Sequence, residues 1–184
     1  MKIPFLDLKA PYQALQTDLD AAFRRVMESG WYILGSEVET FEDAFAAYCE
    51  AKHCIGVGDG LDALVLILRG YGIGPGDEVI VPANTYIASW LAVSYVGARP
   101  VPVEPDSATW NIDSEQIDRA ITSKTRAIMA VHLYGQPCNM TVSLPLLKNM
   151  TFLLSRITLR HMALRGRGSL LVVLEISMQL VFIP

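Results

Sequence analysis

Between residues 53 and 131 the chain alternates short apolar runs with helical segments, and this pattern strongly limits the possible folds. The apolar runs span residues 53–57, 78–81, 99–103 and 127–131, and the helical segments span residues 62–71, 86–96 and 113–121. Strands separated by helices pair in parallel, because the crossover needs a connection of that length. We therefore predict an α/β fold with helices on both faces of a mostly parallel sheet.

Two helices are predicted ahead of the first strand. Leu15, Leu19 and Phe23 fall at helical spacing within a segment that spans residues 12–27. Glycine and two aromatic residues at positions 30–32 interrupt it. Ser36 followed by Glu39 has the pattern of a capping box, which predicts a second helix as far as residue 49.

The composition changes abruptly near residue 140. Residues 1–140 carry ten Lys or Arg and eighteen Asp or Glu, whereas residues 141–184 carry five Lys or Arg and one acid, Glu175. The net charge changes from −8 to +4, a contrast that one evolved domain rarely shows. We therefore treat residues 1–140 as part of a domain and residues 141–184 as a separate tail.

The composition of the whole chain narrows the function classes. Apolar residues make up 52% of the sequence, enough for a real core. The net charge is −4 and no cluster of Lys and Arg indicates a nucleic acid or a membrane as partner. The N-terminus has no secretory signal. Three cysteines with neither disulfide nor zinc spacing favour a cytoplasmic protein without a metal site.

A glycine turn at residues 58–60 follows the first predicted strand. The free N–H groups of such a turn and the positive end of the helix dipole can bind a phosphate. The same glycines can also serve only a tight turn, which is the simpler interpretation of this stretch alone. A dinucleotide site fits less well, because Gly56, Gly58 and Gly60 give G-x-G-x-G instead of G-x-G-x-x-G.

Two more segments follow predicted strands, at the edge where open parallel sheets bind ligands. Residues 82–89 contain Tyr86, which can stack on a heteroaromatic ring or be an ordinary half-buried helix residue. Residues 131–136 contain His132, which has no Ser or Cys partner of a catalytic triad nearby, and a lone histidine is more often a structural residue than a catalyst. Trp31 can stack on a sugar ring, or it can equally be a core residue.

Six segments, in order along the chain, resemble those of the DegT/DnrJ/StrS family of sugar aminotransferases. The resemblance is greatest to members that aminate C3 of a dTDP-3-keto-6-deoxyhexose, and it covers about residues 3–140. Each segment is weak evidence alone, but the ordered set is specific. The segments are FLDL at 5–8, GWY at 30–32, GLDAL at 60–64, GDEVIVP at 76–82, TYIA at 85–88 and HLYGQ at 132–136.

The resemblance implies part of the large domain of a type I aminotransferase, a three-layer αβα arrangement that is truncated here. It also implies a homodimer and pyridoxal 5′-phosphate (PLP), which passes an amino group from glutamate to a nucleotide-linked keto-deoxysugar. The resemblance assigns the cofactor phosphate to the amides of Gly60 and Leu61, and stacking on the pyridine ring to Tyr86. The candidate substrate contacts are Trp31, Tyr32 and His132.

Two groups that the family needs are missing from these 184 residues. The acid opposite the pyridine nitrogen occurs in strings like VIEDNAQAHGA, and the lysine that binds the cofactor covalently occurs in strings like SFYPGKN. Neither string is present, and Lys124 and Lys148 do not stand at the family position. Asp59 stands where relatives often carry Asn or Ser. We therefore predict no catalytic lysine, no transaminase activity and at most weak cofactor binding.

One lost nucleotide after the Met140 codon accounts for the tail. Codons compatible with the sequence from Thr141 onward can be re-read in the shifted frame as SITAFAEKYDIFVIEDNAQAHGA. Those for residues 171–184 can be re-read as GGFGDINATSFYP. Both are family strings at the expected spacing, so we predict that residues 141–184 are an out-of-frame tail without a domain. Two alternative functions are a non-catalytic binding or dimerisation fragment and a small nucleotide-binding α/β domain.

Overall fold

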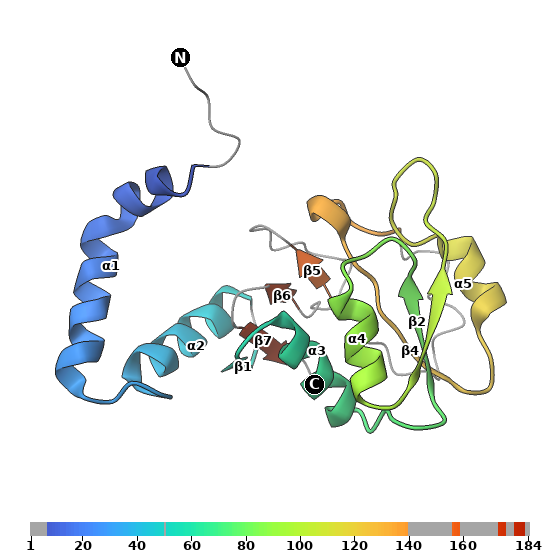
Figure 1. Cartoon of the computed structure of the whole chain (residues 1–184), viewed down its shortest axis with the longest axis horizontal. Helices are drawn as coiled ribbons and strands as arrows, with labels where there is room; N and C mark the ends of the chain where they lie inside the picture. The colour runs from blue at the N-terminus through green and yellow to red at the C-terminus, as the bar shows by residue number, and fades with distance from the viewer. Residues whose placement is uncertain (1–6, 50, 140–155, 159–172, 176–178, 183–184) are drawn as a thin grey trace, which may run out of the picture. The chain divides into compact units, whose positions relative to one another are not determined.

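The computed structural model describes residues 7–49, 51–139, 156–158, 173–175 and 179–182. The chain divides into two compact units, residues 1–44 and residues 45–184. Each unit has its own helices, and all the strands belong to the second (Figure 1). None of the helices in the described ranges is both long enough and apolar enough to span a membrane.

The first unit is helical. It contains α1 (Lys9–Ser29) and most of α2 (Ser36–Tyr48). Gly30 ends α1 with a φ of +67°, a left-handed conformation that glycine adopts without strain, so the predicted break is confirmed. The predicted capping box is wrong in register. Ser36 is the first residue of α2, and the carbonyl of Gly35 accepts the first N–H bonds of the helix.

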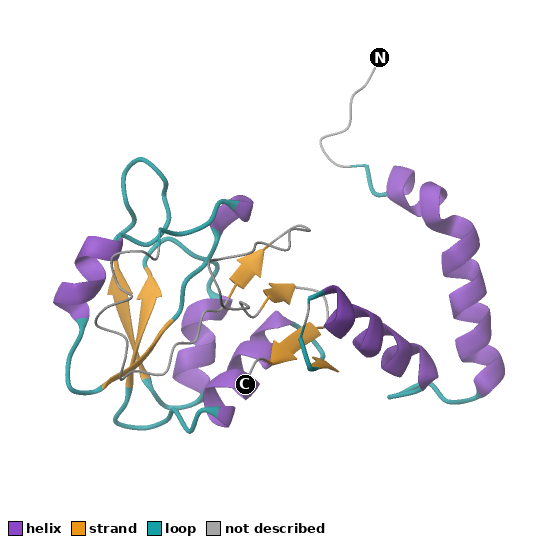
Figure 2. Ribbon diagram, turned by 180° about the vertical axis from the view of Figure 1, so that it is seen from behind, coloured by secondary structure: helices purple, strands orange, loops and turns teal. Residues whose placement is uncertain are grey.

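The second unit alternates strands and helices as predicted, which Figure 2 shows from the opposite side to Figure 1. The differences from the predicted boundaries are small. The elements that precede the tail are β1 (His53–Gly56), α3 (Gly60–Gly70), β2 (Glu78–Pro82), α4 (Ala88–Tyr95), β3 (Arg99–Val103), α5 (Ser114–Ala120), β4 (Thr125–Ile128) and the 3₁₀ turn η1 (Leu133–Gly135).

A parallel sheet with the order β3-β2-β4 lies between two layers of helices. Val79 and Val81 of β2 pack with α3 and α4 on one face. Ile80 points to the other face and packs with Ile117 of α5. Because alternate residues of a strand face opposite sides, a strand that is apolar throughout must be covered twice. The predicted α/β fold with three αβα layers is therefore confirmed.

A second sheet has the order β1-β7-β6-β5. It includes β5 (Arg156–Thr158), β6 (Val173–Glu175) and β7 (Gln179–Phe182). β7 runs antiparallel to β1 and β6, whereas β5 and β6 are parallel. The prediction for residues 141–184 lies outside the described residues except for these three short strands, and it remains a prediction.

Two predicted boundaries shift by two or three residues. β4 begins and ends earlier than predicted, and α4 begins at Ala88 instead of residue 86. Residues 129–131 are buried although they lie past the end of the strand. An apolar run predicts burial, whereas the length of a strand also depends on where its neighbour stops pairing.

Candidate functional site

The carboxyl ends of β2, β3 and β4 meet at one edge of the parallel sheet, and three connections leave from there (Figure 1). These connections span residues 83–87, 104–113 and 129–138. Ligands of open parallel sheets bind at this edge. Tyr86 and His132 lie on two of the three connections, as predicted from sequence.

The start of α3 offers two backbone donors. Asp59 caps the helix, and its Oδ1 accepts the N–H of Asp62 at 2.9 Å. The N–H groups of Gly60 and Leu61 donate no hydrogen bond within the described part of the chain. The first amides of a helix lie at the positive end of its dipole. This helix start is therefore suited to an anion such as a phosphate.

Two carboxylates stand beside the same donors. The Asp59 carboxylate is held by its capping bond. A Cβ placed on Gly58 would lie 2.9 Å from Oδ2 of Asp62, so that carboxylate covers the glycine closely. Negative charge at both positions opposes the binding of a phosphate. The donors fit the phosphate of the cofactor, but the surrounding charge weakens that fit.

Tyr86 lies on the connection between β2 and α4 and is 67% exposed. Its carbonyl accepts the N–H of Ser89 at 3.1 Å, and the hydroxyls of Thr85 and Ser89 are 3.0 Å apart. These bonds fix the backbone around the ring without covering the ring. The alternative reading of Tyr86 as a half-buried helix residue is wrong, because Tyr86 precedes the helix and is exposed.

His132 is buried at the start of the connection after β4. Its Nδ1 accepts the N–H of Cys138 at 3.0 Å, so the hydrogen of the neutral ring is on Nε2. The Cys138 thiol donates to the carbonyl of Val131 at 3.0 Å, and burial raises the pKa of that thiol to about 11. A thiol in this state is a poor nucleophile near neutral pH. The pair therefore stabilises the loop.

Asn111 is a residue that the sequence analysis missed. It is only 2% exposed. Its Nδ2 donates to the carbonyl of Gln136 at 2.9 Å, and its Oδ1 accepts the N–H of Leu133 at 3.1 Å. A single asparagine between two elements gives no periodic signal. Its role depends on the approach of two connections that lie 22 or more residues apart in sequence.

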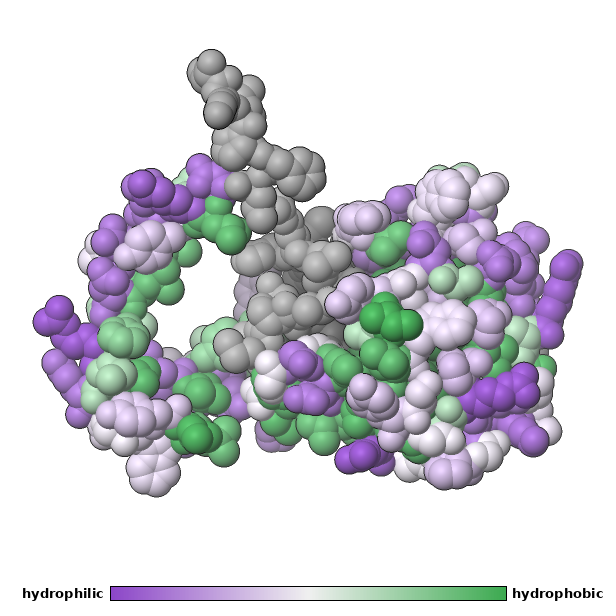
Figure 3. All heavy atoms as spheres, in the orientation of Figure 1, coloured by the Kyte–Doolittle hydropathy of each residue, from purple (hydrophilic) through white to green (hydrophobic). Residues whose placement is uncertain are grey.

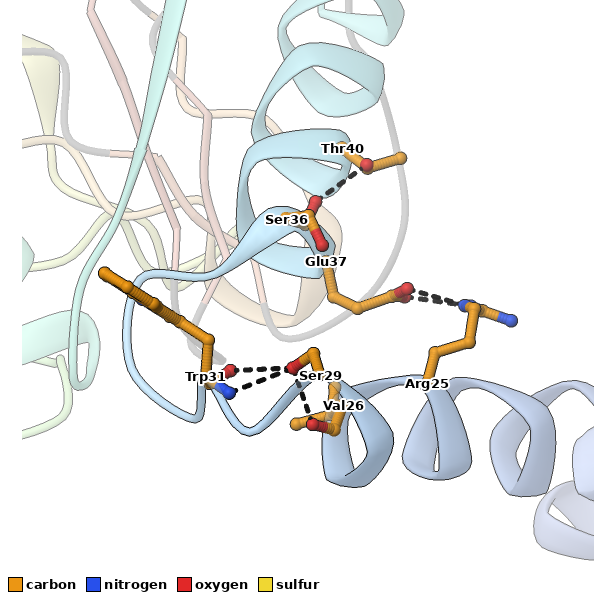
Figure 4. Close-up of polar contacts among 7 residues, drawn as sticks. All are labelled: Arg25, Val26, Ser29, Trp31, Ser36, Glu37 and Thr40. Atoms are coloured by element: carbon orange, nitrogen blue, oxygen red, sulfur yellow. Dashed lines mark hydrogen bonds and ion pairs between the residues drawn. The ribbon is translucent and has the colours of Figure 1, made fainter.

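Trp31 and Tyr32 belong to the first unit. Both are exposed, so the alternative reading of Trp31 as a core residue is wrong. The N–H of Trp31 donates to Oγ of Ser29 at 3.0 Å (Figure 4). Both aromatic residues line a pocket that also includes Arg25 and Glu37. The structure thus places these two candidate residues at a pocket of the first unit, and their role in substrate binding stays a prediction.

The connections that follow β2, β3 and β4, over residues 83–87, 104–113 and 129–138, contain no lysine. Lys124 is at the amino end of β4, where its carbonyl accepts the N–H of Glu78 at 2.9 Å. This position is at the opposite end of the strand from the connections that carry Tyr86 and His132. Within the described part of the chain, no group of three metal-binding side chains comes together.

Comparison with known proteins identifies the family. The profile of the DegT/DnrJ/EryC1/StrS aminotransferase family matches residues 13–152. The dTDP-3-amino-3,6-dideoxy-alpha-D-galactopyranose transaminase of Aneurinibacillus thermoaerophilus is 63% identical over 138 residues, which are 75% of this chain. The match spans only 38% of the length of that enzyme.

Solved structures agree with the sequence comparison. The S. venezuelae protein DesV, solved in complex with a ketimine intermediate, superposes with a TM-score of 0.83 at 49% identity. The superposition covers 94% of this chain and 48% of DesV. NtdA from Bacillus subtilis, solved with bound cofactor PMP, gives a TM-score of 0.82 at 29% identity and covers 94% of this chain and 40% of NtdA. The chain belongs to the DegT/DnrJ/EryC1/StrS aminotransferase family.

Proposed function

We propose that this chain corresponds to the cofactor-binding N-terminal part of a PLP-dependent nucleotide-sugar aminotransferase, and that the 184 residues alone do not catalyse transamination. The whole enzyme would move an amino group from glutamate to a nucleotide-linked keto-deoxysugar, as a cytoplasmic homodimer. Membership of the family and the identity to a dTDP-sugar transaminase support this substrate class.

Two donors at the start of α3, which have no hydrogen-bond acceptor among the described residues, carry the proposal. The N–H groups of Gly60 and Leu61 would hold the cofactor phosphate. The exposed ring of Tyr86 would stack on the pyridine ring. When bound, the cofactor supplies the electron sink that amino transfer requires. Trp31, Tyr32 and His132 remain candidate substrate contacts.

Catalysis needs more than these groups. The printed sequence contains neither the string that carries the acid opposite the pyridine nitrogen nor the string that carries the covalent lysine. We infer that residues 141–184 are read out of frame, which would explain both losses at once. Sequencing of the coding DNA around codon 140 tests this inference, and an intact reading frame would disprove it.

Cofactor binding is tested by replacing one donor. Gly60→Pro removes the first N–H of α3, at a helix position where proline is tolerated and after an extended Asp59. A lost bond to a charged group costs about 1.5–3 kcal/mol, so we expect PLP affinity to fall at least about tenfold. Ser114→Pro makes the same change at the start of α5 and should leave PLP affinity unchanged.

A separate experiment tests whether the chain lacks the lysine that binds the cofactor covalently. After reduction with borohydride, peptide mapping of the PLP-loaded chain should find no lysine with a covalent pyridoxyl group. A modified lysine would overturn the proposal that this chain lacks the catalytic amine. Unchanged PLP affinity in Gly60→Pro, with Ser114→Pro equally folded, would instead remove the assignment of the phosphate site.

The exposed apolar face of α1 supports a second candidate function, a fragment that pairs with a full-length homologue. Leu15, Leu19 and Phe23 are all exposed on this helix. Co-purification with a full-length relative would support this candidate, and recovery of the chain only as aggregates would argue against it.

A further inference from the structure

Two aromatic residues of the second unit have strained backbones. Trp110 has a φ of +60° and Tyr134 a φ of +53°, in the left-handed region where glycine costs less than any L-residue with a side chain. Their side chains are 61% and 86% exposed, so neither contributes much to the core. Packing therefore does not account for a large ring at either position, and strain of this kind occurs at ligand sites.

One buried side chain connects the two strained residues. Asn111 directly follows Trp110, and its amide bonds to Leu133 and Gln136 on either side of Tyr134, at 3.1 and 2.9 Å. The backbone around Trp110 is fixed from the other side as well. Its N–H donates to the carbonyl of Asp106 at 2.8 Å. The two aromatic residues thus belong to one hydrogen-bonded unit.

The same unit reaches the third connection of the candidate edge. Nδ2 of Asn84, two residues before Tyr86, donates to the carbonyl of Trp110 at 3.3 Å. Each of the connections that follow β2, β3 and β4 therefore carries one exposed aromatic residue, and two asparagine side chains join the connections. In Figure 1 these connections leave the sheet at the same edge.

We propose that Trp110 and Tyr134 form an aromatic rim that contacts a ring of the nucleotide-linked sugar. This inference rests on the proposed function, in which Tyr86 contacts the cofactor, and it concerns two residues to which the family resemblance assigned no role. Aromatic side chains stack on nucleobases and pack on the apolar faces of sugars. A nucleobase and a sugar both present a flat or apolar ring face to such a side chain.

The negative charges near Trp110 favour contact of the rim with an uncharged ring of the ligand and disfavour contact with its diphosphate. Oδ1 of Asp106 accepts the N–H and the hydroxyl of Thr109, both at 2.8 Å, and these bonds lower the pKa of that carboxyl. Glu104 adds an exposed acid on the same connection. Two carboxylates repel a diphosphate, so the phosphates would lie away from Trp110.

The strain gives a test that separates ligand contact from a structural role. Tyr134→Gly and Trp110→Gly remove a ring and relieve the backbone at once. We expect the thermal unfolding midpoint of each variant to stay unchanged or rise, while the affinity for a dTDP-6-deoxyhexose falls about tenfold. Tyr95→Ala, an exposed tyrosine at the far end of α4, should change neither quantity much.

Thymidine diphosphate as a second probe identifies which ring is bound. An equal loss of affinity for both probes assigns the rim to the base, and a loss limited to the dTDP-6-deoxyhexose assigns it to the sugar. The proposal is overturned if the glycine variants bind both probes as the unaltered chain does, or if the unaltered chain binds neither. PLP titration of the same preparation shows in either case whether the proposed function stands.

Discussion

α1 and α3 are both amphipathic, but they differ in what they bury. α3 buries five of its eleven residues, including Leu64 and Ile67, against the sheet and α4. α1 has 21 residues and none of them is buried. Figure 3 shows apolar residues along the surface of the helices in the first unit. An apolar stripe therefore predicts a helix, whereas burial requires a complementary surface.

The largest expected effect comes from shortening one leucine in each of these two helices. Leu64→Ala in α3 leaves a cavity in a fully buried site, and we expect a loss of about 2–5 kcal/mol in the free energy of unfolding of the second unit. Leu19→Ala makes the same change on the exposed face of α1 and should cost no more than about 0.5 kcal/mol. Urea unfolding followed by circular dichroism and tryptophan fluorescence measures both.

An equal cost for the two variants would mean that α1 is covered in solution. The concentration dependence of the unfolding midpoint would then tell whether another chain covers it, because association makes stability depend on protein concentration.

The sequence could predict helices and strands from local periodicity, but it could not predict which of their faces are buried. The alternation of strands and helices depends on local periodicity, so β3 was predicted with its observed ends. The start of α5 was equally local, since Asp113 accepts the N–H of Glu115 at 2.9 Å and the side-chain amide of Gln116 at 2.8 Å. The exposure of Trp31 could not be predicted from the local sequence, because the spacing of apolar residues does not show which faces pack against another element.

A second test uses the protection of a thiol in the second unit. The pKa of Cys138 is raised to about 11 by burial, which lowers the thiolate fraction about 100-fold near neutral pH. We expect Cys138 to be alkylated at least about 100-fold more slowly in the folded chain than in urea. Peptide mapping after timed reaction with iodoacetamide follows Cys138 separately from the other cysteines. Fast alkylation of the folded chain would mean that this core opens readily.

A third test compares a hydroxyl that bonds to a buried carboxylate with a hydroxyl that bonds only to the backbone of an exposed helix. Thr122 Oγ1 donates to Oε2 of the buried Glu78 at 2.6 Å. Thr122→Val removes this donor from Oε2, and we expect a cost of about 1.5–3 kcal/mol in unfolding free energy. Thr40→Val removes a hydroxyl that donates to the carbonyl of Ser36 on exposed α2, and should cost less than about 0.5 kcal/mol.

Equal costs for the two valine variants would remove the contrast between the units. A small cost in both would show that Glu78 finds another donor, for which Arg99 is the nearest charge, with 3.6 Å between NH1 and Oε1.

Some residues of the candidate site are marked by a local sequence motif, whereas others depend on contacts between segments that are distant in sequence. The donors at the start of α3 lie in a local Gly-Asp-Gly turn that the sequence shows, and their assignment to the cofactor phosphate comes from the family resemblance and stays a prediction. Asn111 joins connections that are distant in sequence, and no motif marks it. The left-handed backbones of Trp110 and Tyr134 were equally hidden, because neither residue type favours that conformation.

The smallest expected effect concerns the ion pair that joins the helices of the first unit. Nε and NH2 of Arg25 donate to the two carboxylate oxygens of Glu37 at 2.6 and 2.8 Å (Figure 4). The hydrogen bond from Arg25 lowers the pKa of Glu37. A group with a lowered folded pKa stabilises the fold above its unfolded pKa, about 4.3 for Glu, and loses that contribution as the pH falls through the folded value.

Because both side chains are exposed, water and salt weaken the pair, so the effect should be visible in the titration and barely in stability. NMR titration of the Glu37 carboxyl should give a pKa below the usual range, and Arg25→Gln should return it to that range. An unchanged titration in Arg25→Gln would mean that the pair does not persist in solution. The contact between α1 and α2 would then depend on the backbone of residues 30–35 alone, and the first unit would differ from the second even more than its burial indicates.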